Sequence, residues 1–309
     1  MKNITILCPK SEFTLNQLQK LEHAGQVSFI ESGKESSLKD LIKLSKEADI
    51  LAFSIDKLGK HASEWLSEIL EKSPNVKGLA LNTIHADYVN EAYCRERGIR
   101  VFTVLDYKTE AVAEHVILLL LDCAKRFSIN DRRTYRRKYQ PELGFETRGK
   151  RLGIVGSDQT AERVCHLAKA FGMAVYATER FEGAYRESLG GLLCSSEILT
   201  IHLPDTEENK KFLSKERIAH LKQGAIVINL SGRDLVDERA MAEALKTGKV
   251  NQYVFEAESM GKSPLADVET AIMFKPFSGL THEAFKRRGD SWVINIANLA
   301  GKSSSFRSL

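Results

Sequence analysis

This chain of 309 residues has few cysteines, no long apolar run and only a small net charge. The five cysteines, an odd number, are scattered without a CxxC spacing, which is typical of reduced thiols and not of a disulfide framework. The longest apolar run, Val116–Leu121, is far shorter than a membrane span. We therefore expect a cytoplasmic protein with no membrane segment and no metal site.

The formal net charge of +4 is too small to imply a polyanionic partner. One local exception is the basic run RRTYRRKY, residues 132–139, but no nucleic-acid recognition motif accompanies it. We expect this run to be a solvated helix face or loop, and nucleic acid is not the expected partner. Binding of an acidic partner stays an alternative, which a steep salt dependence would reveal.

Short apolar runs alternate with amphipathic stretches of helical period, a pattern that predicts a doubly wound parallel sheet. The pattern occurs twice, so the sequence predicts an α/β protein with two Rossmann-like domains. Between the two series, Thr109–Phe127 is too densely apolar for a helix with one exposed face, which indicates a buried interdomain or subunit-interface helix. The amphipathic stretch Ser291–Gly301 is expected to return to the first domain. The predicted strands are Ile4–Cys8, Val27–Ile30, Ile50–Phe53, Val76–Leu81, Ile99–Phe102, Arg151–Val155, Ala174–Ala177, Ile198–Ile201, Ala225–Asn229 and Gln252–Phe255.

Five ordered segments carry a resemblance to a known family. DYKTEAVAEH resembles GYNxxAVAEH, IHLPDTEEN resembles HxPLTxxT, AIVINLSGRDLVDERA resembles INxxRGxxVDExAL, and VFEAE resembles DVFExEP, while Arg148–Lys150 precedes the nucleotide-binding strand. Together they resemble the D-2-hydroxyacid dehydrogenases. The resemblance implies a flavodoxin-like substrate lobe at residues 1–100, completed by the helix at 286–309, and an NAD-binding Rossmann lobe at 101–285. It also implies a homodimer joined around Thr109–Phe127 and a small-molecule ligand in the cleft between the lobes.

The phosphate loop of this resemblance departs from GxGxxG. Gly156 is kept and Ala161 is an accepted variant of the third glycine, but Asp158 replaces the second glycine, which lets the backbone approach a pyrophosphate. A carboxylate there adds bulk and negative charge. Alternatively, Asp158 caps the following helix and takes the amides that a phosphate would need. Either way, NAD stays possible but is expected to bind weakly.

Glu179 follows the next strand, where an acidic side chain would accept ribose hydroxyls and repel a 2′-phosphate, so NADP is less expected than NAD. The neighbouring Arg180 leaves this discrimination open. Tyr253 replaces the aspartate that in the family contacts the nicotinamide, and His202 belongs to the HxP motif. The residues implied at the cofactor site are Gly156, Ser157, Asp158, Gln159, Thr160, Glu179, His202, Pro204, Asn229 and Tyr253.

The catalytic positions depart further from the family. Gly232 stands where the family carries the arginine that binds the substrate carboxylate, and Phe277 where it carries its acid/base histidine. Phenylalanine cannot transfer a proton. The glutamate that supports the histidine survives as Glu258, while His85 and Arg233 are polar residues that could have moved into the cleft. Each of these three is open to a plainer interpretation as a surface residue.

Two functions follow from this pattern. In the first, the chain has lost ordinary 2-hydroxyacid dehydrogenase activity and is a ligand-binding or regulatory homologue. In the second, it is an NAD-dependent oxidoreductase or a non-redox enzyme of altered chemistry that uses His85, Glu258 and Arg233. Because the charge clamp and the proton donor are both replaced, the first hypothesis is favoured.

Overall fold

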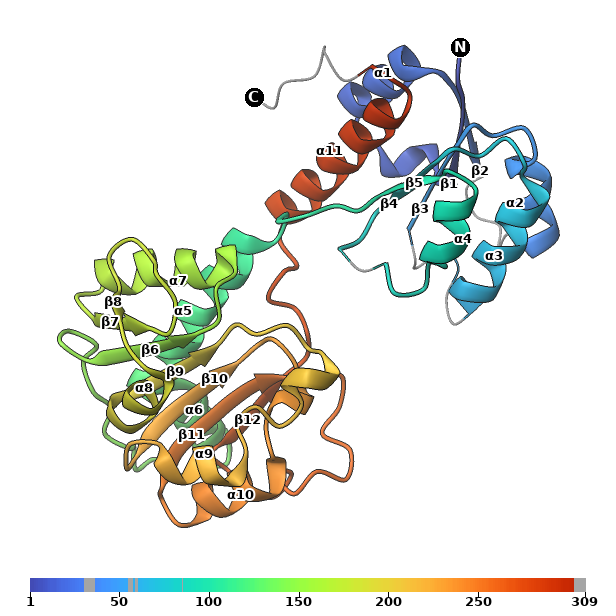
Figure 1. Cartoon of the computed structure of the whole chain (residues 1–309). Coiled ribbons are helices and arrows are strands. Elements are labelled where there is room, and N and C mark those ends of the chain that lie inside the picture. Colours follow the sequence, from blue (N-terminus) through green and yellow to red (C-terminus); the bar gives the residue numbers. More distant parts are fainter. Residues whose placement is uncertain (31–36, 55–57, 59–60, 85, 303–309) are drawn as a thin grey trace. The chain divides into compact units, whose positions relative to one another are not determined.

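The computed structural model describes residues 1–30, 37–54, 58, 61–84 and 86–302, and the chain divides into two compact units. The first comprises Met1–Tyr107 and His282–Leu309, and the second comprises Lys108–Thr281. Each unit is built on one parallel sheet, as Figure 1 shows. The predicted α/β class with two Rossmann-like domains is therefore confirmed.

In the first unit, five strands lie in the order β2-β1-β3-β4-β5. Apolar residues alternate between the two faces of this sheet, and each face is covered by helices. Leu7, Leu51 and Leu79 pack with α2 and α3, whereas Ile6 and Ala80 pack with α1 and α11. The elements are β1 (Asn3–Pro9), η1 (Lys10–Glu12), α1 (Leu15–Ala24), β2 (Gln26–Ile30), α2 (Leu38–Ser45), β3 (Ile50–Phe53), α3 (Ala62–Lys72), β4 (Gly78–Leu81), α4 (Glu91–Glu96), β5 (Arg100–Phe102) and α11 (His282–Leu299).

The helix α11 is the last element of the chain, yet it packs in the first unit. Trp292 is almost fully buried, donates a hydrogen bond from its indole nitrogen to the carbonyl oxygen of Ala80 at 3.0 Å, and stacks on Phe13 at 5.5 Å. Burying a tryptophan with its N–H satisfied gives α11 a strong anchor on this sheet. The first residue of this helix is His282, which is exposed.

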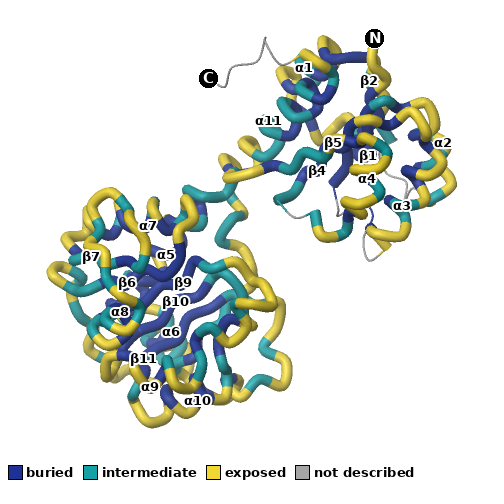
Figure 2. Tube along the Cα trace, viewed as in Figure 1, coloured by how far each residue is buried: buried dark blue, intermediate teal, exposed yellow. Residues whose placement is uncertain are grey.

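In the second unit, seven strands lie in the order β12-β11-β10-β9-β6-β7-β8. The strands β6, β9, β10 and β11 are largely buried, as Figure 2 shows, whereas both residues of the edge strand β8 are exposed. The helices α5, α6 and α7 cover one face, and α8, α9 and α10 cover the other. The elements are α5 (Thr109–Lys125), α6 (Phe127–Tyr135), β6 (Arg151–Val155), α7 (Gln159–Ala170), β7 (Ala174–Ala177), β8 (Tyr185–Arg186), α8 (Leu189–Ser195), β9 (Ile198–Ile201), η4 (Glu207–Asn209), α9 (Lys215–His220), β10 (Ala225–Asn229), η5 (Arg233–Leu235), α10 (Glu238–Lys246), β11 (Val250–Glu256) and β12 (Ala271–Phe274).

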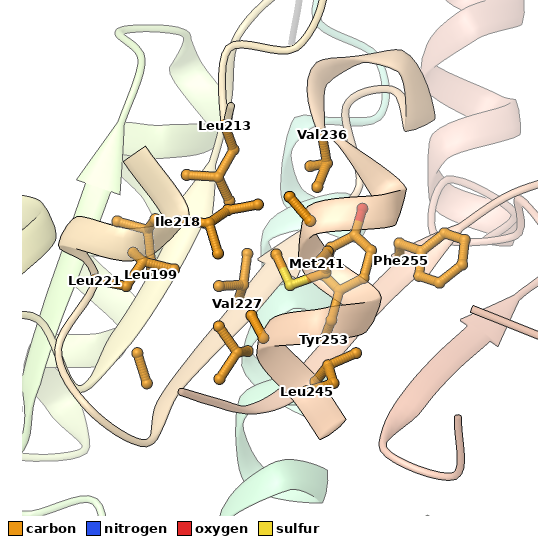
Figure 3. Close-up of a cluster of buried hydrophobic side chains, with 14 of the residues drawn as sticks. Leu199, Leu213, Ile218, Leu221, Val227, Val236, Met241, Leu245, Tyr253 and Phe255 are labelled. Carbon is orange, nitrogen blue, oxygen red and sulfur yellow. The ribbon is translucent and has the colours of Figure 1, made fainter. Parts of the chain in front are cut away.

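Figure 3 shows the core between this sheet and α9 and α10, where Leu199, Val227 and Tyr253 from the strands meet Ile218 and Met241 from the helices. Two strands of this sheet, β8 and β12, were not predicted from the sequence. No α-helix separates β11 from β12 among the described residues, so the alternation that reveals the other strands is missing there.

The densely apolar segment Thr109–Phe127 is not one helix. It forms α5, which ends at Lys125 because Arg126 adopts a left-handed conformation, with φ 55°. The chain then starts α6 at Phe127. No helix among the described residues is both long enough and apolar enough to cross a bilayer.

Candidate functional site

A cavity of about 450 Å³ lies in the second unit at the carboxyl ends of β6, β7 and β9. In the strand order, β7 and β9 lie on opposite sides of β6. The chain therefore adds β7 on one side of β6 and later places β9 on the other side. Such a switch point opens a crevice at the ends of the strands, where ligands bind in open α/β sheets. The lining residues are Val155, Gly156, Ser157, Asp158, Thr178, Glu179, Leu189, His202, Leu203, Pro204 and Phe212.

Gly156 directly follows β6 and lines this cavity. Its φ of +112° is a conformation that side chains disfavour, and a Cβ atom there would overlap the carbonyl oxygen of His202. The amide of His202 donates in turn to the carbonyl oxygen of Val155 at 2.7 Å. The first glycine of the loop is therefore needed for the close approach of the β6 and β9 ends.

Asp158 is the N-cap of α7, so the capping alternative drawn from the sequence is confirmed. Its Oδ1 accepts a hydrogen bond from the amide of Ala161 at 2.7 Å. The first amides of a helix have no partner within the helix and bind either a capping side chain or an anion. Asp158 therefore takes one of the donors that a phosphate would use.

His202 lies beside Asp158, with its Nδ1 3.8 Å from Oδ1 of the carboxylate. Its Nε2 is 3.0 Å from the hydroxyl of Thr200. Burial lowers the pKa of His202 well below its usual value, and the attraction of Asp158 offsets this only in part. The imidazole is therefore neutral at pH 7 and brings no positive charge to the cavity.

The other residues implied at the cofactor site fall into two groups. Glu179 and Pro204 line the cavity, while Gln159 and Thr160 in the first turn of α7 are not among its lining residues. Tyr253 is fully buried in the core, where its ring stacks on Phe255 at 4.7 Å. A fully buried side chain offers no surface to a cofactor.

The loop after β10 is held by Asn229, which is 1% exposed. Its side-chain amide donates to the carbonyl oxygen of Gly232 at 2.7 Å and to the hydroxyl of Tyr253 at 3.3 Å. Its Oδ1 accepts from the amide of Ser231 at 3.2 Å. Asn229 therefore fixes the loop instead of lining the cavity.

Gly232 faces Asp205, a contact that the sequence analysis missed. A Cβ atom built on Gly232 would lie 2.5 Å from Oδ2 of Asp205. Asp205 stands at the leucine of the HxPLTxxT motif that the sequence resembles. At positions 232 and 205 the resemblance implies an arginine and an apolar leucine. This chain instead has a glycine, which lacks a side chain, and an aspartate, which carries a carboxylate. The sequence could have indicated this contact only if positions 205 and 232 had been compared with the family motifs together.

Arg233 is fully engaged in local contacts. Its guanidinium pairs with the carboxylate of Glu238 through Nε and Nη2, and donates to the carbonyl oxygens of Ser259 at 2.9 Å and Met260 at 3.3 Å. Arg233 lines a second, larger cavity of about 800 Å³, which is distinct from the one at the ends of β6, β7 and β9. Because Glu238 and two carbonyl oxygens hold the guanidinium, Arg233 stabilises its own loop and has little freedom to bind an anion.

Phe277 packs its ring against His115 of α5, with the ring centroids 4.9 Å apart. The loop that carries Phe277 is fastened by Glu256, whose carboxylate accepts hydrogen bonds from the amides of Phe277 at 3.1 Å and Ser278 at 2.9 Å, and from the Ser278 hydroxyl at 3.0 Å. The loop at the position of the family histidine is therefore fixed by hydrogen bonds, but it carries an apolar ring in place of an imidazole.

His115 was also missed as a site residue. It is 8% exposed, and its Nε2, which has no hydrogen-bond partner, lies 3.9 Å from Oε1 of Glu256. Burial lowers the pKa of His115, and the charge of Glu256 partly offsets this. The available signal was its place at the end of the DYKTEAVAEH segment, which the resemblance shares with the family.

The remaining candidates do not form a cluster. Glu258 is 82% exposed and pairs with Lys275 at 3.3 Å, a contact of the kind that contributes little. His85 lies outside the described residues. No group of three or more His, Cys, Asp or Glu side chains that could hold a metal ion occurs in the part of the chain that the structure describes.

The cap gives a first test of this geometry. Asp158→Ala should lower the free energy of unfolding by about 1 kcal/mol, because the Ala161 amide loses its acceptor. Asp158→Asn should lower it far less, since an asparagine oxygen caps nearly as well. Urea denaturation followed by circular dichroism measures both. Equal losses in the two variants would contradict a capping role.

Comparison with known proteins supports a single family. Residues 117–279, more than half of the chain, match the model of the D-isomer specific 2-hydroxyacid dehydrogenase, NAD binding domain. The D-3-phosphoglycerate dehydrogenase of Archaeoglobus fulgidus is 29% identical over 248 residues, which are 76% of this chain and 47% of that protein. The glyoxylate reductase of Korarchaeum cryptofilum is 27% identical over 297 residues, 90% of this chain and 88% of that protein.

The chain spans about half the length of the phosphoglycerate dehydrogenases that it matches. Among solved structures, a glyoxylate reductase from Paecilomyes thermophila has a TM-score of 0.77 at 20% identity and covers 98% of this chain and 96% of its own, a likeness that shows the fold. From the matched family model and the shared architecture, this chain belongs to the D-isomer-specific 2-hydroxyacid dehydrogenase family.

Proposed function

We propose that this chain is a ligand-binding member of the family that has lost ordinary 2-hydroxyacid dehydrogenase activity. The observation that carries the proposal is position 232, where a Cβ atom would lie 2.5 Å from the Asp205 carboxylate. The family uses an arginine here to bind the carboxylate of its substrate. An aspartate in the same space repels that carboxylate, so the reactive carbon of a 2-hydroxyacid would lose its orientation.

The histidine position supports the same conclusion. Phe277 lies with its ring against the buried His115, and neither group offers an accessible proton. General acid–base catalysis contributes about 10²- to 10⁴-fold to a reaction rate. Together with the loss of substrate orientation, its absence should remove most of the activity.

Family membership supports a nicotinamide cofactor in the second unit. The described residues fit such a cofactor only in part. Glu179 suits the ribose hydroxyls of NAD and disfavours the 2′-phosphate of NADP. Asp158, however, takes the Ala161 amide and adds a negative charge where the diphosphate would lie. We therefore propose that NAD binding is weakened, and we assign no reaction step to it.

The alternative of an enzyme with altered chemistry finds no support among the described residues. Arg233 is held by Glu238 and two carbonyl oxygens, and Glu258 is exposed beside Lys275. Neither arrangement leaves the charged group free to act on a bound substrate.

A homodimer is the proposed assembly. Large apolar side chains are exposed on α5, on α6 and on the segment that follows, and exposed apolar surface of this kind marks interfaces. The same region contains the basic run at residues 132–139, whose Arg133 already pairs with Glu142 at 2.7 Å and Glu269 at 3.0 Å. The exposed apolar residues are Leu118, Phe127, Tyr135, Tyr139 and Leu143.

Sedimentation equilibrium tests this assembly. The wild-type chain of 34.6 kDa should sediment with about twice that mass, and Leu118→Lys/Phe127→Lys should sediment as a monomer. Leu15→Lys, at an exposed leucine of α1, serves as the control and should stay dimeric. A monomeric wild type would contradict the proposal.

Turnover assays test the loss of activity. With glyoxylate or hydroxypyruvate and saturating NADH or NADPH, the wild-type chain should show no oxidation of the cofactor above the uncatalysed rate. The glyoxylate reductase of Korarchaeum cryptofilum, assayed alongside, controls for the conditions. Turnover by the wild type that disappears in Glu258→Gln would overturn the proposal and favour the enzyme of altered chemistry.

A further inference from the structure

The cavity at the ends of β6, β7 and β9 is lined by negative charges, whereas a nucleotide phosphate binds best beside positive charges. Building on the proposed function, we propose that it takes an uncharged nucleoside, a flat ring on a sugar with a vicinal diol, in preference to a phosphorylated nucleotide. Family membership alone would predict the reverse preference. The inference rests on the groups that line this cavity and on the contacts that they already make.

The charge of the lining is the first argument. Among the described residues that line the cavity, Asp158 and Glu179 carry negative charges, and there is no lysine or arginine. Arg180, next to Glu179 in the sequence, is not one of the lining residues. His202 is the one basic side chain in the lining, and burial keeps it neutral at pH 7. A bound phosphate would therefore face two carboxylates without a compensating cation.

The donors at the start of α7 are the second argument. Phosphate binding at a helix start depends on free backbone amides. The Ala161 amide, which has no partner within the helix, donates to Oδ1 of Asp158 at 2.7 Å. A phosphate would have to displace a hydrogen bond to a charged group, which is among the stronger ones. One of the donors at the helix start is therefore already taken.

The features that recognise an uncharged nucleoside are all kept. Glu179 is placed to accept two hydroxyls of a diol, as acidic residues do at this position of the fold. Leu189, Leu203 and Phe212 give the lining an apolar part on which a flat ring can pack. A volume of about 450 Å³ lies within the range of small-molecule sites. Apolar contacts and hydrogen bonds to hydroxyls both tolerate a negative surface, whereas a phosphate does not.

Calorimetric titration of the full chain with adenosine and with AMP tests the inference. These probes differ only in the phosphate, so their affinity ratio isolates its effect. The wild type should prefer adenosine by roughly tenfold, the size expected for one carboxylate–phosphate contact that is largely screened by water. Equal or tighter binding of AMP, or no binding of adenosine at millimolar concentration, would overturn the inference.

Three variants separate charge from hydrogen bonding. Asp158→Asn keeps a cap acceptor but removes the charge, so it should reduce the preference for adenosine. Asp158→Gly also frees the Ala161 amide and should shift the preference further, toward AMP. Glu162→Gln removes a charge from an exposed residue of the same helix outside the lining, and should leave the ratio unchanged. An unchanged ratio in both Asp158 variants would contradict the mechanism.

The outcome is independent of the activity assay. A chain that turned over 2-hydroxyacids would overturn the proposed function, while the adenosine to AMP ratio would still report the charge of the cavity. A chain with no turnover that preferred AMP would overturn only the inference. The two failures can therefore be told apart.

Discussion

The proposed loss of dinucleotide binding depends on the hydrogen bond from the Ala161 amide to the Asp158 carboxylate. A helix start must give its first amides to some acceptor, and a side chain that is covalently present competes with any ligand from solution. Asp158 also sets the charge of the cavity beside the neutral His202. One residue thus caps α7 and takes one amide that an anion could otherwise use.

A second substitution of the same kind lies at the end of β10. Asn229 fixes the loop through Gly232 and Tyr253, so the direction of a side chain at position 232 is set by the backbone. That direction leads to Asp205. Restoring an arginine at Gly232 would therefore require the Asp205 side chain to move aside. In both places a carboxylate lies where the resemblance implies that the family binds negative charge, and the proposed change in ligand rests on these two positions.

The sequence predicted the architecture because the strands are short apolar runs between amphipathic helices, as at Ile198–Ile201 and Ala225–Asn229. It missed β12, which follows β11 without a helix. It offered the cap as one of two interpretations of Asp158, because an aspartate directly before a helix has a local role, and the structure bears that interpretation out. It could not predict the contact of Gly232 with Asp205, or of Phe277 with His115, because these pairs come together only when distant segments of the chain pack.

The central claim is that Asp158 closes the phosphate loop to a dinucleotide, and titration of the chain with NADH tests it most directly. The account predicts weak or undetectable binding by the wild type and at least tenfold tighter binding by Asp158→Gly, which frees the Ala161 amide and removes a negative charge. Tight binding of NADH by the wild type, unchanged in Asp158→Gly, would contradict it.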